Sequence, residues 1–258
     1  MNSIPNTLYK YRPINLHTLR IISHSQLYFP LSNEFNDPFD SKIIPDLKFN
    51  NEEELEKFLR DVTSANPDVD SQSLKERWYS IELEKFRASM HNDVHKFIQT
   101  LRLCCLSEKS DSTMMFSHYA NGHRGICFEF MVKDDDFFDV LRPVIYPTVF
   151  PTINPSEMCP YKPISKERLW MVLEVQFLSK SPDWSYEKEW RILKADAESA
   201  TYSFSEDALT AIIFGCKTTK EDKELIRAIN QSRKTPAVLK EAYIIDKSFS
   251  IGIRNCIL

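Results

Sequence analysis

The chain has 258 residues, of which 42% are hydrophobic and 27% are charged, and its formal net charge is −4. That length and composition are typical of a globular protein with a substantial core. The acidic balance gives no general attraction to nucleic acid, and the apolar runs fall short of the roughly 18 residues that cross a bilayer.

The N-terminal part of the sequence predicts two strands around a helix. Residues 7–13 and 26–30 have the composition of strands, and apolar residues recur at helical spacing over residues 16–25. Residues 50–65 predict a further helix, which begins with an asparagine cap and an acidic first turn. The helical pattern continues beyond it, so we expect a helical insertion at about residues 50–100.

The remainder of the sequence predicts mostly strands. These are expected over residues 101–107, 124–132, 142–147, 187–195, 210–215, 237–246 and 249–255. Helices are expected over residues 111–122, 163–179 and 218–234, the first capped by Asp111 and ended by Gly122. The pattern predicts a single α+β domain over residues 1–258. Its sheet is expected to be mixed or antiparallel and to be flanked by helices, and a split sheet fits the same pattern.

Cysteine and glycine usage limits the chemistry further. The six cysteines form no CxxC pair and no Cys/His spacing suited to zinc, so we expect free thiols in the cytoplasm. The first residues lack the basic and apolar segments of a signal peptide, which favours the same compartment. The sequence has four glycines, and neither a Rossmann fingerprint nor a P-loop can be built from their spacing. A nucleotide would have to be held by side chains and ordinary element ends.

Polar residues among aromatic ones mark candidate binding groups in two segments. Tyr9 and Tyr11 share one side of the first predicted strand, and Arg12 lies on the other. They are either two half-buried tyrosines beside a surface arginine, or a ring for a base and a cation for a phosphate. His118 and Tyr119, on a predicted helix, could place a polar tip over a pocket.

The segment NEFNDPFD, after the second predicted strand, has the residues of a tight turn. Asparagine and proline at residues 36–38 favour it, because an asparagine side chain caps its own backbone and proline fixes φ. Phe35 and Phe39 are then expected to dock the turn onto the core. The turn does not require Asp37 and Asp40 together, so the loop is also a candidate for one wall of a pocket.

Glu187, Glu189 and Arg191 alternate along one side of the strand predicted over residues 187–195. A row of this kind is usually a solvated sheet face. In a cleft, however, Glu189 between aromatic residues could act as a general base or stabilise a cation. Both interpretations are open at this point.

Four segments together resemble a bacterial family known as domain of unknown function 2971. They are LYKYRP at residues 8–13, LYFPLSNEFNDPFD at 27–40, CLSEKSDSTMMFSHYANGHRGICFEF at 105–130 and WSYEKEWRI at 184–192. Their order and spacing match over nearly the whole chain, with the weakest match in residues 45–100. The resemblance implies that the NEFNDPFD loop at residues 33–40 borders the same site as SHY at 117–119 and EKEWR at 187–191, but it carries no activity.

The chain also resembles the ADP-ribosyltransferase scheme, in which NAD lies across a split sheet without a glycine-rich loop. This resemblance implies that Glu189 is catalytic, stabilising the oxocarbenium-like transition state. It implies cofactor-binding roles for Tyr11, Arg12, Asn36, Asp37, His118 and Tyr119, with Asp40, Glu187 and Arg191 as further pocket residues. The sequence departs from the scheme because the first strand has no histidine and no Ser-Thr-Ser strand is present.

From these observations we expect an NAD-dependent ADP-ribosyltransferase-like or NAD-hydrolysing enzyme, acting as a bacterial toxin or phage-defence effector. It would bind NAD without a metal, and we expect no membrane partner. One alternative is a metal-dependent nuclease or phosphodiesterase, with Mg²⁺ held by Asp37, Asp40 and either Glu187 or Glu189. The other is a non-enzymatic protein-interaction module in which the same polar clusters stabilise the fold.

Overall fold

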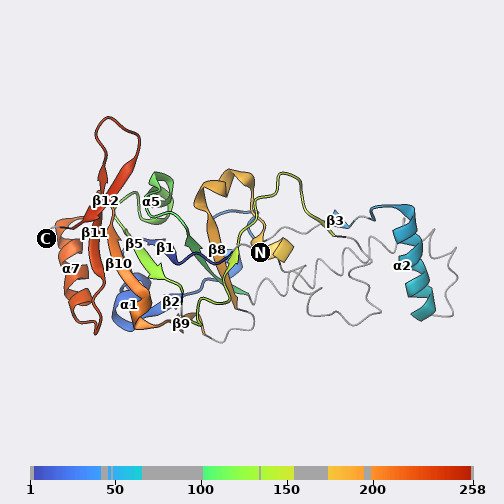
Figure 1. The fold of residues 1–258 in the computed structure, drawn as a ribbon, viewed down its shortest axis with the longest axis horizontal. Helices are drawn as coiled ribbons and strands as arrows, with labels where there is room; N and C mark the ends of the chain where they lie inside the picture. Colours follow the sequence, from blue (N-terminus) through green and yellow to red (C-terminus); the bar gives the residue numbers. More distant parts are fainter. Residues whose placement is uncertain are drawn as a thin grey trace. The chain divides into compact units, whose positions relative to one another are not determined.

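The computed structural model describes residues 3–41, 46–47, 49–65, 101–133, 135–153, 174–194 and 199–256. The chain divides into two compact units (Figure 1). The first unit comprises Met1–Pro30, Leu101–Val144 and Trp184–Leu258, and the second comprises Leu31–Thr100 and Ile145–Asp183. The assignment of residues 1–258 to a single domain stays a prediction.

The first unit is built on an eight-stranded mixed sheet, so the predicted α+β class is confirmed. Its strands are β1 (Thr7–Arg12), β4 (Arg102–Ser107), β5 (Ile126–Met131), β6 (Arg142–Pro143), β8 (Glu189–Lys194), β10 (Leu209–Phe214), β11 (Val238–Ile244) and β12 (Ile251–Asn255). They lie in the order β12-β11-β10-β5-β1-β4-β8-β6. The β10–β11 pair is parallel and the other neighbouring pairs are antiparallel. A smaller sheet pairs β2 (Gln26–Tyr28) with β9 (Thr201–Ser203).

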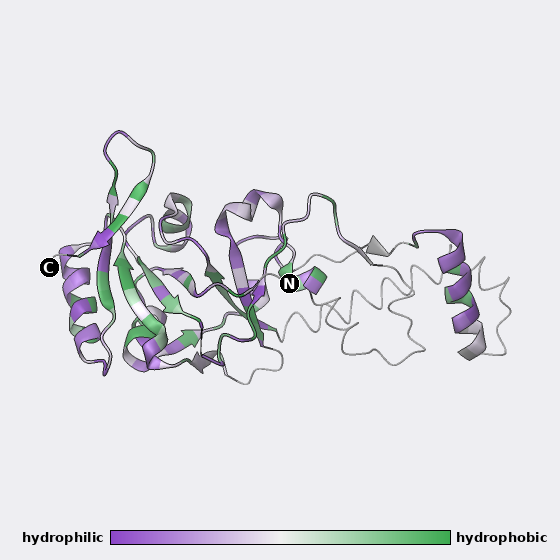
Figure 2. Cartoon of the chain, viewed as in Figure 1, coloured by the Kyte–Doolittle hydropathy of each residue, from purple (hydrophilic) through white to green (hydrophobic). Residues whose placement is uncertain are grey.

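The second unit contains α2 (Glu52–Ala65) and the parallel pair β3 (Asp46–Leu47) and β7 (Thr152–Ile153). The side chain of Asn51 accepts a hydrogen bond from the Glu54 amide at 2.9 Å, which is the predicted cap. One stripe of α2 is hydrophobic and the rest is hydrophilic (Figure 2). The later part of the predicted insertion and most of the predicted helix over 163–179 lie outside the described residues.

The α-helices of the first unit each begin after a residue whose side chain caps the helix. Asn15 caps α1 (Leu16–His24), and Thr219 caps α7 (Lys220–Gln231). In α5 (Thr113–Tyr119) the prediction is wrong at both ends. Ser112 caps this helix in place of Asp111, because its hydroxyl accepts from the Met115 amide at 3.3 Å. The helix ends at Tyr119, and Gly122 lies in the following turn at a φ of 59°.

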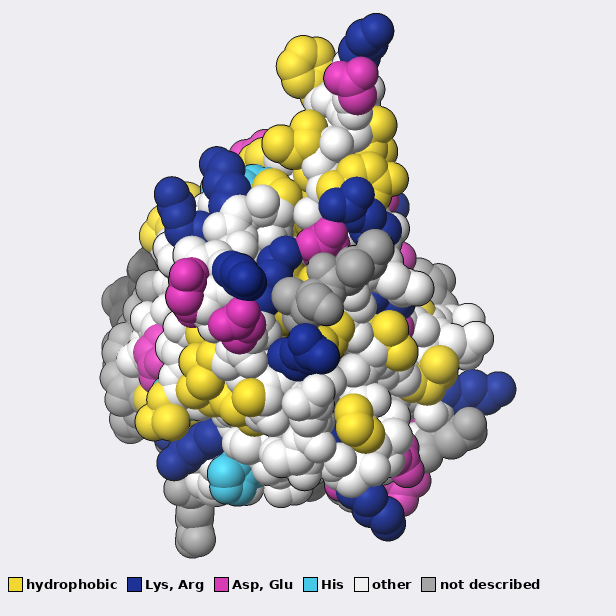
Figure 3. All heavy atoms as spheres, turned by 90° about the vertical axis from the view of Figure 1, so that its left-hand side faces the viewer, with side chains coloured by type: hydrophobic (Ala, Val, Ile, Leu, Met, Phe, Trp, Pro, Cys, Tyr) yellow, Lys and Arg dark blue, Asp and Glu magenta, His cyan; other side chains and the backbone are white. Residues whose placement is uncertain are grey.

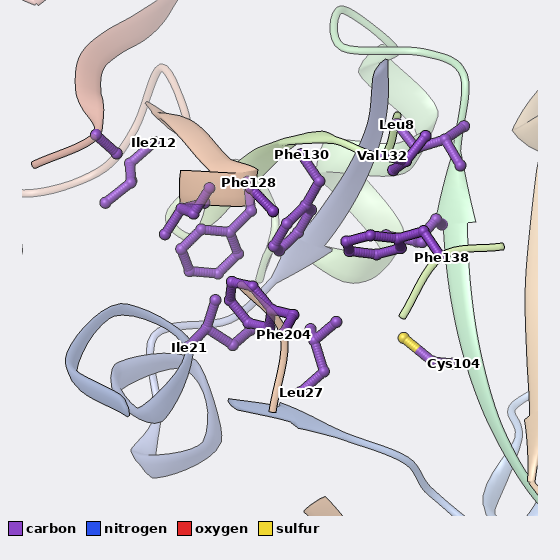
Figure 4. Packing of buried hydrophobic residues seen from close by; sticks show 14 of the residues in the cluster. Leu8, Ile21, Leu27, Cys104, Phe128, Phe130, Val132, Phe138, Phe204 and Ile212 are labelled. Carbon is purple, nitrogen blue, oxygen red and sulfur yellow. The ribbon is translucent and has the colours of Figure 1, made fainter. Parts of the chain in front are cut away.

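Alternating residues of the sheet build a core on each of its two faces. On one face, Leu8, Phe128 and Phe130 pack with Ile21 of α1, and Ile226 of α7 joins the same cluster (Figure 4). We call this the α1 face. On the other face, which we call the α5 face, a second cluster packs against α5. It comprises Tyr11, Met115, Phe116, Ala120, Cys127, Ile213, Ala242 and Ile251.

Two glycines are explained by close backbone packing. A Cβ on Gly125 would lie 2.3 Å from the Arg12 carbonyl oxygen, and one on Gly215 would lie 2.2 Å from that of His123. These residues therefore hold the turn after α5 against β1 and β10. Their place in the fold agrees with the absence of a glycine-rich phosphate loop.

The hairpin of β11 and β12 projects beyond the sheet (Figure 1). Its end carries apolar side chains, with Ile244 70% exposed and Phe249 fully exposed (Figure 3). Around it, positively and negatively charged side chains are interspersed on this side of the molecule. Within the described ranges, no helix combines the length and the apolar character that crossing a bilayer requires.

Candidate functional site

The carboxylate row predicted on one strand is divided between two elements. Glu187 ends a 3-10 helix, η4 (Pro182–Glu187), and β8 begins only at Glu189. Lys188 between them adopts a left-handed φ of 46°, which breaks the alternation. The expectation of a continuous strand row is therefore wrong for Glu187. A turn, and not the strand period, brings this residue to its position.

Glu189 and Arg191 form a buried ion pair on the α5 face. Arg191 Nε lies 2.7 Å from Glu189 Oε1, and Nη2 lies 3.0 Å from Oε2. Glu189 is 5% exposed and Arg191 is 0% exposed, so a solvated sheet face is excluded. Bidentate geometry of this kind is what makes a buried ion pair tolerable in a dry interior.

Two residues of β4 lie opposite this pair. Ser107 faces Glu189 in the register, and Cys105 faces Arg191. Burial raises the pKa of the Cys105 thiol, and the negative charge of Glu189 raises it further. Cys105 is therefore a poor nucleophile at neutral pH.

Glu187 is tied to both neighbouring elements. The Tyr119 hydroxyl, at the end of α5, donates to Glu187 Oε1 at 2.6 Å. The Ser107 hydroxyl of β4 donates to the Glu187 carbonyl at 2.5 Å. Glu187 is 2% exposed. Residues predicted from separate motifs thus meet at one buried carboxylate.

Aromatic rings lie beside this carboxylate. Trp184 of η4 has its ring centroid 6.1 Å from the imidazole of His118 and 6.1 Å from the ring of Tyr186. His118 is exposed and Trp184 is partly exposed. Together with Tyr119 they form an aromatic rim next to Glu187.

Tyr11 lies on the α5 face, where its contacts stabilise the fold. Its hydroxyl donates to the Lys109 carbonyl at 2.7 Å and accepts from the Ser112 amide at 3.4 Å. Its ring meets Phe116 edge-on at 4.9 Å. Burial raises the pKa of this phenol, which favours its neutral form. Tyr11 therefore positions the start of α5, and the structure gives it no open ring for stacking.

Arg12 lies on the α1 face, because successive residues of β1 point to opposite sides of the sheet. It therefore does not join Glu187 and Glu189 on the α5 face. This is the opposite-side arrangement expected from the strand period, and the cofactor-binding roles of Tyr11 and Arg12 stay predictions.

The predicted loop lies in the second unit and has its own internal contacts. Asp37 Oδ1 accepts from the Phe39 amide at 2.9 Å, which is an Asx turn. Asp40 lies 3.6 Å from Lys180 Nζ, and both side chains are buried. Phe39 is 71% exposed, so the expectation that it docks onto the core is wrong, and Asn36 is exposed as well. That this loop borders the site of Glu187 stays a prediction.

The described residues give no support to a metal site. Among them, no three His, Cys, Asp or Glu side chains gather closely enough to hold a metal ion. His118 lies against Trp184, whereas His123 stacks on Phe116 at 5.9 Å. The metal-dependent alternative thus stays a prediction without a structural observation behind it.

The contacts of several residues were not predicted from the sequence. Ser107 was assigned to a strand without a role, and Lys180 directly follows the helix expected over residues 163–179 and was given no role. Glu108 accepts a hydrogen bond from Trp190 Nε1 at 2.7 Å, which fixes β8 against β4. The one available signal was alternation, which places Ser107 on the same side of β4 as Cys105.

Residues 115–192 match the model of a family described as protein of unknown function (DUF2971). This confirms the family resemblance over residues 115–192, which include WSYEKEWRI and most of the motif at 105–130, and the resemblance of the motifs at 8–13 and 27–40 stays a prediction. The matched segment includes Tyr119, Glu187, Glu189 and Arg191. No curated protein and no solved structure matches the chain.

Proposed function

We propose that the chain is an NAD-consuming enzyme, either an ADP-ribosyltransferase or an NAD hydrolase, with its reacting carboxylate at Glu187. One observation carries the proposal. The Tyr119 hydroxyl holds Glu187 Oε1 at 2.6 Å beside the aromatic rim of His118 and Trp184. A buried carboxylate beside aromatic rings suits a substrate with a flat, cationic leaving group.

The chemistry follows from the charge that develops in the reaction. Cleavage of the bond between ribose C1 and nicotinamide nitrogen leaves positive charge on the ribose, and the electron pair leaves with nicotinamide. A fixed carboxylate stabilises that oxocarbenium-like state. Water, or an acceptor hydroxyl, then forms the new C1–O bond, and its proton passes to Glu187. Tyr119 holds the carboxylate in place, and the aromatic rim takes the nicotinamide ring.

Glu189 has a different role in this proposal from the one implied by the resemblance. Both of its carboxylate oxygens are bound by the Arg191 guanidinium, which balances its charge. Glu187 Oε1 accepts a hydrogen bond from the Tyr119 phenol at 2.6 Å. A carboxylate whose charge is balanced by a guanidinium stabilises a cationic transition state less well, so the reacting role is assigned to Glu187 and not to Glu189.

The test is nicotinamide release from NAD by the purified full chain, followed by chromatography. Glu187→Gln should lower the rate about 100-fold or more, because it removes the stabilising charge. Tyr119→Phe should lower it about 10-fold. Glu221→Gln, the same change at an exposed position on α7, should leave the rate unchanged. Thermal unfolding of each variant shows that the fold is kept.

Two results would contradict the proposal. The first is a wild-type chain that neither binds NAD in calorimetry nor releases nicotinamide. The second is a Glu187→Gln variant with the wild-type rate. A loss confined to Glu189→Gln, in a variant that unfolds at the wild-type temperature, would move the catalytic role to Glu189.

We also propose that the activity serves as a toxin or phage-defence effector in the cytoplasm. The described cysteines, Cys104, Cys105, Cys127, Cys216 and Cys256, are all free, which suits a reducing compartment. Induced expression in bacteria should then lower cellular NAD and slow growth, and Glu187→Gln should relieve both effects. Slow growth that persists in the Glu187→Gln variant would contradict this role.

A further inference from the structure

Three cations lie at one end of the large sheet on its α1 face. β1 ends at Arg12, β4 begins at Arg102, and β8 ends at Lys194. Neighbouring strands run antiparallel in the order β1-β4-β8, so these three ends lie together. Arg102 and Lys194 are directly opposite each other in the register. We call Arg12, Arg102 and Lys194 the basic cluster.

The strand pattern places the basic cluster on the α1 face. Cys104 and Ile192 belong to the core of that face, and Arg102 and Lys194 lie two residues away from them on the same strands. Arg12 is related to Leu8 in the same way, four residues along β1. As whole residues, all three cations are partly exposed.

No carboxylate neutralises the basic cluster in the part of the chain that the structure describes. None of its members forms an ion pair there. Arg102 Nη1 donates to the Phe29 carbonyl at 3.0 Å, and Lys194 Nζ lies 5.5 Å from the centre of the Tyr202 ring. Arg102 and Lys194 are like charges at opposed positions, an arrangement that is destabilising unless an anion intervenes.

Arg12 is the least satisfied of the three. Its Nε is buried without an acceptor, and no hydrogen bond from its guanidinium is present among the described contacts. Burial lowers the pKa of Arg12, although an arginine side chain remains charged at neutral pH. Other buried guanidiniums of this unit differ: Arg191 has Glu189, and Arg233 donates to three main-chain carbonyls.

Unsatisfied buried polar groups such as the Arg12 Nε are rare in folded proteins. Tyrosine rings lie beside two members of the basic cluster. Lys194 Nζ lies over the Tyr202 ring, and Tyr28, whose ring stacks on His17 at 4.2 Å, is close enough to affect the pKa of Arg12. Arginine and lysine are the side chains that pair with phosphate groups.

We propose that the basic cluster is a binding site for a phosphate-class oxyanion, on the face of the sheet opposite to Glu187. Three positive charges suit a ligand of two or more negative charges, such as a diphosphate. The planar guanidinium of Arg12 can donate two parallel hydrogen bonds to one phosphate. The ligand could be a free anion or the phosphates of a nucleotide, and the same residues would bind either. This site does not depend on the NAD-consuming activity.

The first experiment measures binding of inorganic pyrophosphate to the full chain by calorimetry, at an ionic strength held constant with NaCl. Saturable binding is expected, and Arg12→Gln should weaken it at least 10-fold. Arg20→Gln, the same change at an exposed position on α1, should bind as the wild type does. Glu187→Gln should also bind pyrophosphate normally, which separates this site from the proposed active site.

A parallel titration with ADP distinguishes the two sources of the phosphate group. If ADP binds more tightly than pyrophosphate, and Arg12→Gln weakens the binding of both, the ligand is a nucleotide. Equal or tighter binding of pyrophosphate identifies the free anion. Absence of saturable binding for both probes, or unchanged binding in Arg12→Gln, would overturn the proposal.

A second experiment examines the unliganded protein. If Arg12 awaits an anion, Arg12→Met removes a buried charge and keeps most of the packing, so the melting temperature without phosphate should stay the same or rise. Added pyrophosphate should then raise the melting temperature of the wild type but not of Arg12→Met. If Arg12 only stabilises the fold, Arg12→Met melts lower without anion, and that result would refute a ligand role.

Discussion

The ion pair of Glu189 and Arg191 makes a sharp prediction about stability. Replacing Arg191 by methionine keeps much of the side-chain volume but leaves the Glu189 carboxylate without its guanidinium. Glu189 is 5% exposed and loses contacts of 2.7 and 3.0 Å. Removing one partner of a buried ion pair costs about 3–5 kcal/mol. Since domains are stable by only about 5–15 kcal/mol, the variant should be close to unfolding.

The double replacement should behave differently. With Glu189→Leu and Arg191→Met together, neither position carries a buried charge, and the free energy of unfolding should return to within about 1 kcal/mol of the wild type. The measurement is urea unfolding of the wild type, both single variants and the double variant, followed by circular dichroism. An Arg20→Met variant, on the exposed side of α1, controls for the loss of an arginine.

The coupling between the two replacements decides the matter. We expect the double variant to be at least about 2 kcal/mol more stable than the sum of the single effects would give. If Arg191→Met costs less than about 1 kcal/mol, or if the two effects simply add, Glu189 is not held as a buried pair. Glu189 would then again be the candidate for the catalytic carboxylate.

Other predictions concern single positions. Tyr11→Phe should cost about 1 kcal/mol near neutral pH by removing a buried hydrogen bond. Because the raised pKa of Tyr11 favours its neutral form in the folded state, wild-type stability should fall above about pH 10 more steeply than that of Tyr11→Phe, as alkaline unfolding would show. The pKa of Glu241 is lowered, chiefly by its hydrogen bond from Lys223, so that pair stabilises the fold above about pH 4.3 and the effect is lost in acid. Lys223→Met should therefore cost about 0.5–1 kcal/mol at pH 7 and little at pH 3, and an equal cost at both pH values would contradict this. Gly125→Ala should cost about 3 kcal/mol through contact with main-chain atoms, whereas Gly122→Ala, where only φ is strained, should cost about 1 kcal/mol; equal melting temperatures would refute the difference.

The described helices and strands could largely be predicted from local sequence. The caps of α1 and α7 follow from Asn15 and Thr219, and apolar periodicity located the strands. The start of α5 could not be chosen from sequence, because Asp111 and Ser112 are both good capping residues. Tyr11, from a distant strand, donates to the Lys109 carbonyl and accepts from the Ser112 amide, and thereby fixes this segment.

In the candidate site, too, some features could be predicted from local sequence and others could not. Tyr119, Glu187 and Arg191 could be predicted as site residues from the sequence, because aromatic residues lie close to them along the chain. The left-handed φ of Lys188 could not be predicted, because nothing in the local sequence requires a break there. That break decides which of two glutamates is paired with Arg191 and which with Tyr119.

Alone, the sequence determined the fold class, the family resemblance and the exclusion of glycine-rich phosphate loops, since these depend on residue types and spacing along the chain. The alternation of the first strand also separated Arg12 from Tyr11, and the structure places Tyr11 on the α5 face and Arg12 on the α1 face. Only the tertiary structure decided which strands are neighbours, and therefore which side chains from distant parts of the chain lie together. Arg12 then lies with cations some 90 and 180 residues further along, Arg102 and Lys194, because strand order and not chain distance sets its neighbours.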